Sequence, residues 1–172
     1  MPTYINTIFA DKLEGKEVSL QGWIHRVRSS GNMVFAVVRD STGVIQVAVK
    51  KDKVGEKDFT DASEAYVESS LKVSGTVKKD ERAPGGYELQ ATKFELVSRG
   101  EPFPIAKDLS EEFLLDVRHL WIRSQKLTKI LQIRSTIVQD IHEFFQKQGY
   151  TLFDPPILSP NACEGKMTLF DV

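Results

Sequence analysis

The stretch Glu17–Lys50 reads EVSLQGWIHRVRSSGNMVFAVVRDSTGVIQVAVK and contains three runs of alternating apolar and polar residues, separated by turn-forming residues. Alternation with a period of two sends successive side chains to opposite faces of a strand, so each run predicts a half-buried strand. Several short strands with turns between them are typical of an all-β barrel or sandwich. The predicted inner faces consist of Val18, Leu20, Gly22 and Ile24, then Val34, Ala36 and Val38, and finally Ile45, Val47 and Val49.

The rest of the first hundred residues adds one helix and two strands to this pattern. The alternation is lost over GEKDFTDASEAY, where Phe59, Ala62 and Ala65 fall near one stripe of a helix. Two further alternating runs, 69–79 and 87–98, are joined by DERAPGG, whose Pro-Gly-Gly is a strong turn signal. The order strand, strand, strand, helix, strand, strand predicts an OB-fold, a five-stranded Greek-key barrel.

The outer face of the predicted barrel carries residue types that suit single-stranded nucleic acid. OB-folds commonly bind oligonucleotides through their second and third strands and their first and fourth loops, which are RSSGN and DERAPGG here. Phe35 offers a stacking surface worth ~1–3 kcal/mol per base. The amide of Gln46 suits a base edge, and Arg26 and Arg28 suit phosphates. The alternative is that Phe35 packs beneath a loop and the arginines are only solvated, and the pattern leaves both interpretations open.

The composition is that of a folded protein, with 41% hydrophobic and 27% charged residues in a chain of 172. Its net charge is −1, so any contact with nucleic acid must be a local site rather than a polybasic surface. No apolar run approaches the ~20 residues of a membrane span, and the N-terminus lacks the order of a secretory signal, which predicts a cytoplasmic protein. The single cysteine and three scattered histidines predict neither an intrachain disulfide nor a metal site.

The pattern changes after the first hundred residues. Gly100, Pro102 and Pro104 indicate a linker, because each proline restricts its own φ and disfavours helix in the residue before it. The mixed segment 109–123, LSEEFLLDVRHLWIR, predicts a short helix followed by an extended piece.

The clearest helix of the sequence covers Gln125–Gln148, and Gly149 is well placed to end it. The following segment, YTLFDPPIL, predicts a strand in which Pro155 and Pro156 are confined to an edge or an end. The apolar stripe of the helix is wide, and on pattern alone its plain interpretation is core packing. It consists of Leu127, Ile130, Leu131, Ile137, Val138, Ile141, Phe144 and Phe145.

Four polar or reactive residues in this half carry weaker signals. Glu164 in CEGK suits an ammonium group, but a surface carboxylate beside a turn glycine has the same pattern. Cys163 has no nearby histidine in sequence, which favours an apolar buried thiol over a nucleophile. For His119 and His142, packing or surface positions are expected rather than catalysis.

In combination these segments resemble the N-terminal part of an asparaginyl-tRNA synthetase, a class II enzyme of the aspartyl, asparaginyl and lysyl subgroup. The resemblance runs through GWIHRVRSSGNMVFAVVRDSTGVIQ, ESSLKVSGTVKKDERAPGGYEL, PFPI, FLLDVRHLWIRS, GYTLFDPPILSP and CEGKMTLFDV. The first segment is shared by the subgroup, whereas the second and DVRHLWIRS are more asparaginyl than aspartyl.

The fold implied by the resemblance is mixed. An N-terminal all-β OB-fold barrel of five strands and one helix is followed by a linker and by the first helix and strand of an α+β class II catalytic domain. The expected divisions are an anticodon-binding domain at 1–99, a linker at 100–124 and the start of the catalytic domain at 125–172.

The resemblance also implies roles on the barrel. Phe35 and Gln46 match the positions that stack on and hydrogen-bond the central anticodon base. Arg26 and Arg28 match the basic approach to the anticodon. The expected partner of this face is tRNA with the asparagine anticodon.

Further roles follow for the second half. The long helix and GYTLFDPPIL look like class II motif 1, with Gly149 at the end of the helix and Pro156 in the motif's proline position. Because that motif builds a homodimer interface, it becomes a better account of the apolar stripe than core packing. Glu164 matches the acidic residue that binds the amino group of the substrate amino acid, although Lys166 and Met167 stand where the family places small residues.

The activity implied is that of an asparagine–tRNA ligase, which uses ATP and Mg²⁺ to activate asparagine and then transfers it to tRNA. Motifs 2 and 3, which carry the arginines that hold ATP, are missing, so no catalytic residue is expected within this chain. One alternative keeps the enzyme class and changes the substrate to aspartate. The other is a stand-alone OB-fold tRNA-binding module whose C-terminal segment mediates dimerisation.

Overall fold

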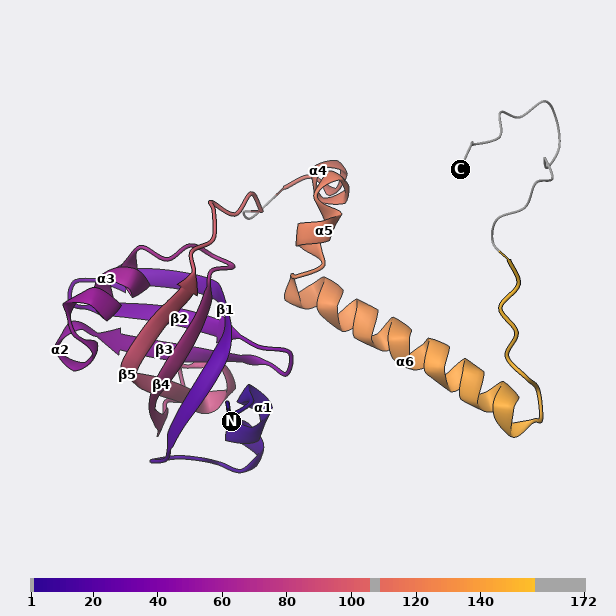
Figure 1. The fold of residues 1–172 in the computed structure, drawn as a ribbon, viewed down its shortest axis with the longest axis horizontal. Helices are drawn as coiled ribbons and strands as arrows, with labels where there is room; N and C mark the ends of the chain where they lie inside the picture. The colour runs from indigo at the N-terminus through magenta and orange to yellow at the C-terminus, as the bar shows by residue number, and fades with distance from the viewer. Residues whose placement is uncertain (1, 106–108, 157–172) are drawn as a thin grey trace. The chain divides into compact units, whose positions relative to one another are not determined.

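The computed structural model describes residues 2–105 and 109–156 (Figure 1). The chain consists of two compact units, Met1–Lys107 and Asp108–Val172. The first unit contains the barrel and the second contains the long helix.

Five strands close into a barrel in the first unit, with the order β1-β2-β3-β5-β4 (Figure 1). The pairing of β3 with β5 is parallel, and the other pairings are antiparallel. This arrangement confirms the predicted OB-fold. The strands are β1 (Glu17–Ser30), β2 (Met33–Arg39), β3 (Val44–Lys50), β4 (Ser70–Lys79) and β5 (Tyr87–Ser98).

The barrel interior is filled by the residues that alternation placed on the inner faces. Along β2 and β3 every predicted inner residue is buried, and Ala48 on the opposite face of β3 is buried as well. The core also receives residues from both later strands and from the helices. Its largest fully buried side chains include Phe94, Ile5, Ile8, Leu20, Ile24, Ile45, Leu71 and Leu89.

Three short α-helices and a 3-10 turn, η1 (Pro84–Gly86), accompany the barrel. The predicted helix is α3 (Glu56–Ser63), which buries Ala62, and the sequence had not indicated α2 (Lys51–Val54) or α1 (Ile5–Ala10). Helix α1 depends on a distant contact, because Asp40 Oδ2 accepts a hydrogen bond from the backbone N–H of Ile5 at 2.8 Å. A helix of this length is marginal by itself, so its existence is a tertiary effect.

The second unit begins with two short helices, α4 (Glu111–Asp116) and α5 (Arg118–Trp121). The short helix was predicted, whereas the extended piece expected after it is wrong. The backbone N–H groups of Leu120 and Trp121 donate to the carbonyl of Val117 at 2.8 and 3.0 Å, so local helical bonds form there. The segment has three consecutive apolar residues rather than an alternating run, and a strand also needs a neighbouring strand for its hydrogen bonds.

Helix α6 (Gln125–Lys147) has a defined cap at each end. Ser124 Oγ accepts from the N–H of Leu127 at 3.3 Å. At the other end Gly149 has φ = +87°, and the N–H of Tyr150 donates to the carbonyl of Phe145 at 3.1 Å. The two rings meet edge to face at 5.5 Å, which completes a Schellman motif with its hydrophobic contact. The predicted helix and its glycine end are confirmed.

The strand predicted after this helix is not formed within the described residues. Residues 150–156 have no regular secondary structure, and residues 157–158 of the predicted strand lie outside the described part. The physical reason is the same as for α5: within the described residues of this unit there is no second strand with which the segment could pair.

The apolar stripe of α6 is open to solvent. None of the residues of this helix is buried. Eight of its large apolar side chains are 41–61% exposed, and Leu127 is half-buried. Within the described residues, no helix is long and apolar enough to cross a membrane.

Candidate nucleic-acid interface

A β-bulge in β1 decides which way its two arginines face. Ile24 pairs with Val38 on β2, but the next paired residue is Arg26, opposite Val37, so His25 is an extra residue in the strand. Before the bulge the even-numbered residues face the core, and after it Val27 packs against the core instead. Since one inserted residue exchanges the two faces of a strand, the bulge turns Arg26 and Arg28 outward.

Two rows of side chains therefore cross the outer face of β1, β2, β3 and β5. Strand register aligns Arg26, Val37, Gln46 and Glu88 in one row. It aligns Arg28, Phe35, Ala48 and Gln90 in the other. The structure thus brings together all four barrel residues that the sequence singled out.

Phe35 and Arg28 form a pair in the second row. The guanidinium carbon of Arg28 lies 4.8 Å from the centroid of the Phe35 ring, which is a cation–π contact. Arg28 is exposed and Phe35 is half-buried, so the pair lies at the surface rather than beneath a loop. A planar ring and a planar guanidinium together provide a surface on which a base can stack.

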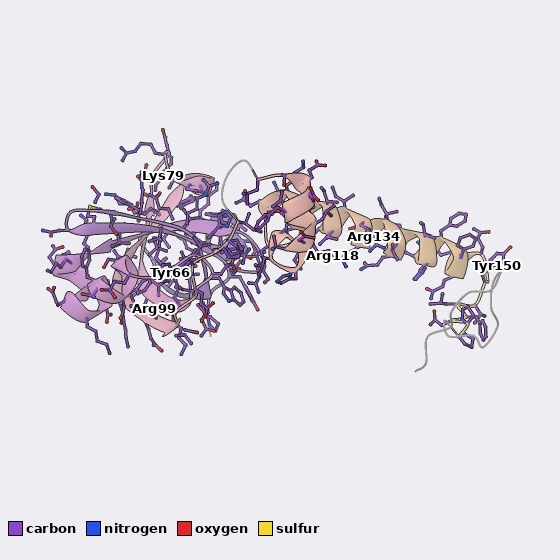
Figure 2. The ribbon with its side chains drawn as sticks, turned by 90° about the horizontal axis from the view of Figure 1, so that it is seen from above. Tyr66, Lys79, Arg99, Arg118, Arg134 and Tyr150 are labelled. Atoms are coloured by element: carbon purple, nitrogen blue, oxygen red, sulfur yellow. The ribbon has the colours of Figure 1, made fainter. Side chains whose placement is uncertain are left out.

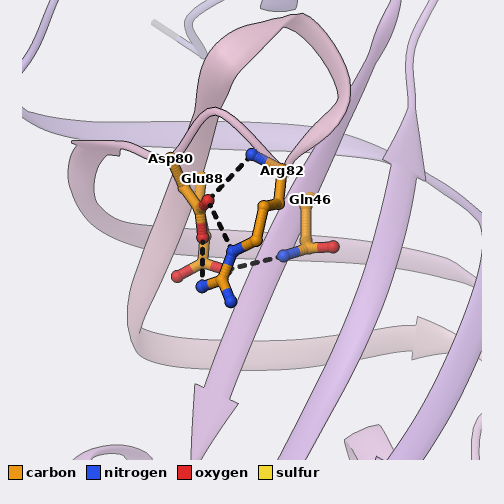
Figure 3. Close-up of polar contacts among 4 residues, drawn as sticks. All are labelled: Gln46, Asp80, Arg82 and Glu88. Atoms are coloured by element: carbon orange, nitrogen blue, oxygen red, sulfur yellow. Dashed lines mark hydrogen bonds and ion pairs between the residues drawn. The ribbon is translucent and has the colours of Figure 1, made fainter.

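Gln46 and Glu88 form a pair in the first row (Figure 3). The amide Nε2 of Gln46 donates to Glu88 Oε2 at 2.7 Å. Glu88 is one of only two buried polar residues of the described chain, with 7% of its surface exposed. This partner was missed in the sequence analysis, because the parallel pairing of β3 with β5 brings it to Gln46 from 42 residues away.

The loop between β4 and β5 adds charged side chains beside this pair (Figure 3). Arg82 donates through its backbone N–H and its Nε to Asp80 Oδ1 at 3.0 and 3.3 Å. These hydrogen bonds lower the pKa of Asp80 and raise that of Arg82. An open pocket of about 530 Å³ lies here, with equal numbers of cations and carboxylates, and is lined by Lys78, Lys79, Asp80, Glu81, Arg82 and Glu88.

The side chain of His25 in the bulge has a lowered pKa. Burial is the largest cause, followed by the positive charges of Arg26 and Arg39, while Glu68 acts in the opposite direction. Arg39 Nη2 donates to both carboxylate oxygens of Glu68 at 3.0 and 2.8 Å. The bulge therefore lies between an exposed arginine and a partly buried ion pair.

The linker leaves the barrel at the end opposite the β4–β5 loop. Lys79 pairs with Tyr87 beside that loop, whereas Ser70 pairs with Ser98 at the far end, next to Arg99 (Figure 2). There the backbone N–H of Gly100 donates to Ser69 Oγ at 2.9 Å, and Arg99 pairs with Glu64 at 2.9 Å.

Each of the two units matches a known protein family. Residues 18–97 match the family of OB-fold nucleic acid binding domains, and residues 110–172 match the class II tRNA synthetases for D, K and N. Both units of the chain are thus similar to parts of class II tRNA synthetases. This confirms the resemblance on which the sequence analysis settled.

The similar synthetases are asparagine–tRNA ligases. That of Koribacter versatilis is 47% identical over 165 residues, which cover 94% of this chain and 37% of the relative. That of Thermoplasma acidophilum is 45% identical over 92% of this chain and 37% of its own length. The chain therefore spans a little over a third of the length of these relatives.

Solved synthetase structures have the same fold. Asparaginyl-tRNA synthetase from Pyrococcus horikoshii, complexed with asparaginyl-adenylate, superposes with a TM-score of 0.85 at 40% identity. The match covers 99% of this chain and 40% of that one. Aspartyl-tRNA synthetase from Entamoeba histolytica superposes with a TM-score of 0.81 at 21% identity, over 94% of this chain and 40% of that one, which shows the shared fold alone.

The other residues to which the sequence analysis drew attention fall outside the barrel. Gly149 ends α6, and Pro156 is exposed at the last described position. Glu164, Cys163, Lys166 and Met167 lie outside the described residues. Their roles, like the roles of the four barrel residues toward tRNA, stay predictions.

Proposed function

We propose that this chain supplies the anticodon-binding domain and the motif 1 region of an asparagine–tRNA ligase. The observation that carries the proposal is the outer face of the barrel, where the bulge aligns Arg26 and Arg28 with Phe35 and Gln46. The asparagine substrate is favoured over aspartate by the 43–47% identity to asparagine–tRNA ligases. The divisions at 1–99, 100–124 and 125–172 belong to the same proposal.

On this face a base stacks against the aromatic ring and the arginines hold the backbone. Arg28 covers one face of Phe35, so a base either uses the other face or extends the stack over the guanidinium. Arg26 in the neighbouring row is exposed and suits a phosphate. The net charge near zero limits the non-specific contribution, so affinity depends on these few contacts.

The complete enzyme catalyses two steps. ATP and asparagine give asparaginyl-adenylate and pyrophosphate, and the terminal adenosine of the tRNA then accepts the amino acid. In this proposal ATP and Mg²⁺ bind the full-length enzyme. Among the described residues there is no group of three or more His, Cys, Asp or Glu side chains that could hold a metal ion. Glu164 is the proposed ligand of the amino group of asparagine.

The proposed homodimer places the apolar stripe of α6, with Gly149 and Pro156 after it, against a second copy. Eighteen large apolar side chains of the described chain are exposed, and eight of them belong to this one helix. Exposed apolar patches of this kind mark protein interfaces.

The test of the proposed function is a titration of the chain with an RNA hairpin that carries the asparagine anticodon loop, at fixed salt. We expect Phe35→Ala to weaken binding by the value of one stacked base, ~1–3 kcal/mol. The matched control is Tyr66→Ala, which removes an aromatic ring that is 45% exposed elsewhere on the barrel (Figure 2).

Equal binding by Phe35→Ala and the unmodified chain would exclude the stacking role. Equal losses in Phe35→Ala and Tyr66→Ala would indicate a non-specific effect. The amino acid is tested separately, by aminoacylation with asparagine and with aspartate on the full-length protein. Charging with aspartate alone contradicts the asparagine assignment and leaves the RNA-binding face unaffected.

A further inference from the structure

We propose that Phe9 on α1 is a positioning residue, which holds the β4–β5 loop so that the guanidinium of Arg82 meets a phosphate of RNA bound on the outer face of the barrel. The inference rests on the proposed function, because it assumes that this face binds RNA. It goes further in assigning a contact to Arg82 and a role in binding to a helix that is not part of the face.

Arg82 lies beside the outer face with its side chain in solvent. It lines the same pocket as Glu88, the partner of Gln46 in the first row. Its Nε and Nη2 atoms donate to Asp80 at 3.3 and 3.4 Å, so one edge of the guanidinium is held. With the side chain 92% exposed, the other N–H groups of the guanidinium can meet a ligand. A guanidinium held in this way suits a phosphate oxygen.

The position of Arg82 depends on the shape of the β4–β5 loop, which is closed by its own backbone. The N–H of Asp80 donates to the carbonyl of Gly86, and the N–H of Gly86 donates to the carbonyl of Ala83, both at 3.0 Å. Between them Gly85 has φ = +75°, a conformation that glycine adopts without strain. The loop therefore holds Asp80, and Arg82 with it, only while the turn η1 stays in place.

Phe9 supports this turn from α1. A Cβ on Gly85 would lie 2.6 Å from Cζ of Phe9, so the ring lies directly against the glycine. The ring also stacks on Tyr87, the first residue of β5, with the centroids 6.1 Å apart and the planes at 29°. Ile5 and Ile8 of the same helix are fully buried, whereas Phe9 is half-buried. The isoleucines fill the core, and the ring of Phe9 is the part of α1 that contacts the loop.

Helix α1 is fixed in turn by the connection between β2 and β3. Besides the bond from Ile5 to Asp40, the N–H of Asn6 donates to Thr42 Oγ1 at 3.1 Å. The other carboxylate oxygen of Asp40 accepts from the N–H groups of Thr42 and Gly43 at 2.6 and 2.9 Å. The helix thus connects two loops of the barrel. A loop that is held before RNA binds loses less conformational entropy on binding.

The experiment measures binding of the RNA hairpin with the asparagine anticodon loop at several salt concentrations. Arg82→Ala should make the slope of log affinity against log salt less steep by about 0.7, the value of one phosphate contact with a single strand. Phe9→Leu removes the ring and keeps an apolar side chain. It should also make the slope less steep, and should weaken binding about three- to tenfold, the cost of ordering one or two side chains.

The double variant decides whether Phe9 acts through Arg82. In the Arg82→Ala background, Phe9→Leu should weaken binding by less than about twofold, because the contact that it positions is already lost. Losses that add in full would mean that Phe9 acts by another route, and they overturn the proposal. An unchanged affinity or an unchanged salt slope in Phe9→Leu overturns it as well.

The matched control is Phe59→Leu. Phe59 on α3 is also half-buried against the barrel core, but its ring lies beneath Lys51, with Nζ 6.0 Å from the centroid, rather than against the β4–β5 loop. We expect this variant to keep both the affinity and the salt slope of the unmodified chain. Equal losses in Phe9→Leu and Phe59→Leu would indicate a general loosening of the barrel and contradict a specific role of Phe9.

A second measurement does not need RNA. Amide hydrogen exchange of Asp80 and Gly86 in the free chain reports on the hydrogen bonds that close the loop. It should become faster in Phe9→Leu and stay the same in Phe59→Leu. Unchanged exchange in Phe9→Leu overturns the inference even if that variant no longer binds RNA. Absence of binding by the unmodified chain to any hairpin contradicts the proposed function, whereas binding with an unchanged salt slope in Phe9→Leu contradicts this inference alone.

Discussion

Ile45 and Ile137 have the same side chain, but one lies in a closed core and the other on an exposed helix face. Ile45 on β3 is fully buried in the barrel, whereas Ile137 on α6 is 52% exposed. Both belong to regular apolar patterns, one with a period of two and the other with the period of a helix. The five strands of the barrel pair in a complete ring, so the apolar side chains of their inner faces enclose one another.

Helix α6 has its backbone hydrogen bonds, but its apolar side chains are not buried. Its backbone groups are bonded within the helix and its ends are capped by Ser124 and by the Gly149 turn, so its secondary structure is complete. Its apolar side chains have no cover within the described part of the chain. Hydrogen bonding therefore explains why α6 is a helix, and burial explains why the barrel is stable.

The largest expected effect is the difference in the loss of stability between alanine substitutions of the two isoleucines. Ile45→Ala should lower the free energy of unfolding of the barrel by ~2–5 kcal/mol, because it leaves a cavity in a closed core. Ile137→Ala should change stability by no more than about 0.5 kcal/mol, since an exposed side chain is replaced by a good helix former. The measurement is denaturant unfolding in dilute solution, followed by Trp23 fluorescence for the barrel and by circular dichroism for the helix.

Light scattering of the Ile137 variant tests the proposed interface at the same time. A weaker self-association of Ile137→Ala than of the unmodified chain supports a second copy as the cover of α6. Comparable losses of stability in the two variants would mean that Ile137 is buried in solution by this same chain, and would break the comparison between the two units.

Two glycines give the next largest contrast. A Cβ on Gly75 of β4 would lie 2.1 Å from the backbone oxygen of Gln90, whereas a Cβ on Gly149 would meet nothing within 4 Å. We expect Gly75→Ala to destabilise the barrel by ~1–3 kcal/mol, because the two strands must move apart. Gly149→Ala should cost about 1 kcal/mol in the helix alone, through its φ of +87°.

Unfolding curves of both variants provide the check, with the barrel and helix signals recorded separately. A loss of barrel stability in Gly149→Ala would show that the two units unfold together. An unchanged barrel in Gly75→Ala would mean that β4 and β5 can separate at this point without cost, which contradicts their close approach.

The sequence predicted those features that depend on neighbouring residues in the chain. Alternation located all five strands, and the helical stripe with Gly149 located α6 and its end. Two of the features that it missed depend on residues far apart. Helix α1 needs Asp40, 35 residues away, and the Gln46–Glu88 pair needs the parallel pairing of β3 with β5.

The candidate site was predicted in its members but not in its geometry. Uninterrupted alternation from Val18 through Ile24 would turn Arg26 and Arg28 inward, so the predicted roles of the two arginines required an irregularity that the pattern did not contain. The bulge at His25 supplies it. A bulge is a difference in length between two paired strands, and it becomes visible only when the register of both strands is known.

The smallest expected effect is the pH dependence of stability that is due to His25 in the bulge. Burial and the charges of Arg26 and Arg39 lower the pKa of His25 below its ordinary value of 6.5, which the unfolded chain retains. As the pH falls through 6.5, the unfolded state takes up a proton that the folded state does not, so the free energy of unfolding decreases. The decrease ends when the pH reaches the lowered pKa of the folded state.

His25→Gln should remove this part of the pH dependence, so its unfolding midpoint should fall less steeply below pH 6.5 than that of the unmodified chain. The matched control is His142→Gln, whose side chain belongs to α6 in the other unit and whose barrel transition should follow the unmodified chain. If the unfolding midpoints of His25→Gln and the unmodified chain fell equally steeply with pH, protonation of His25 would not destabilise the folded barrel. The partly buried setting inferred for the bulge between Arg26 and the Arg39–Glu68 pair would then be wrong.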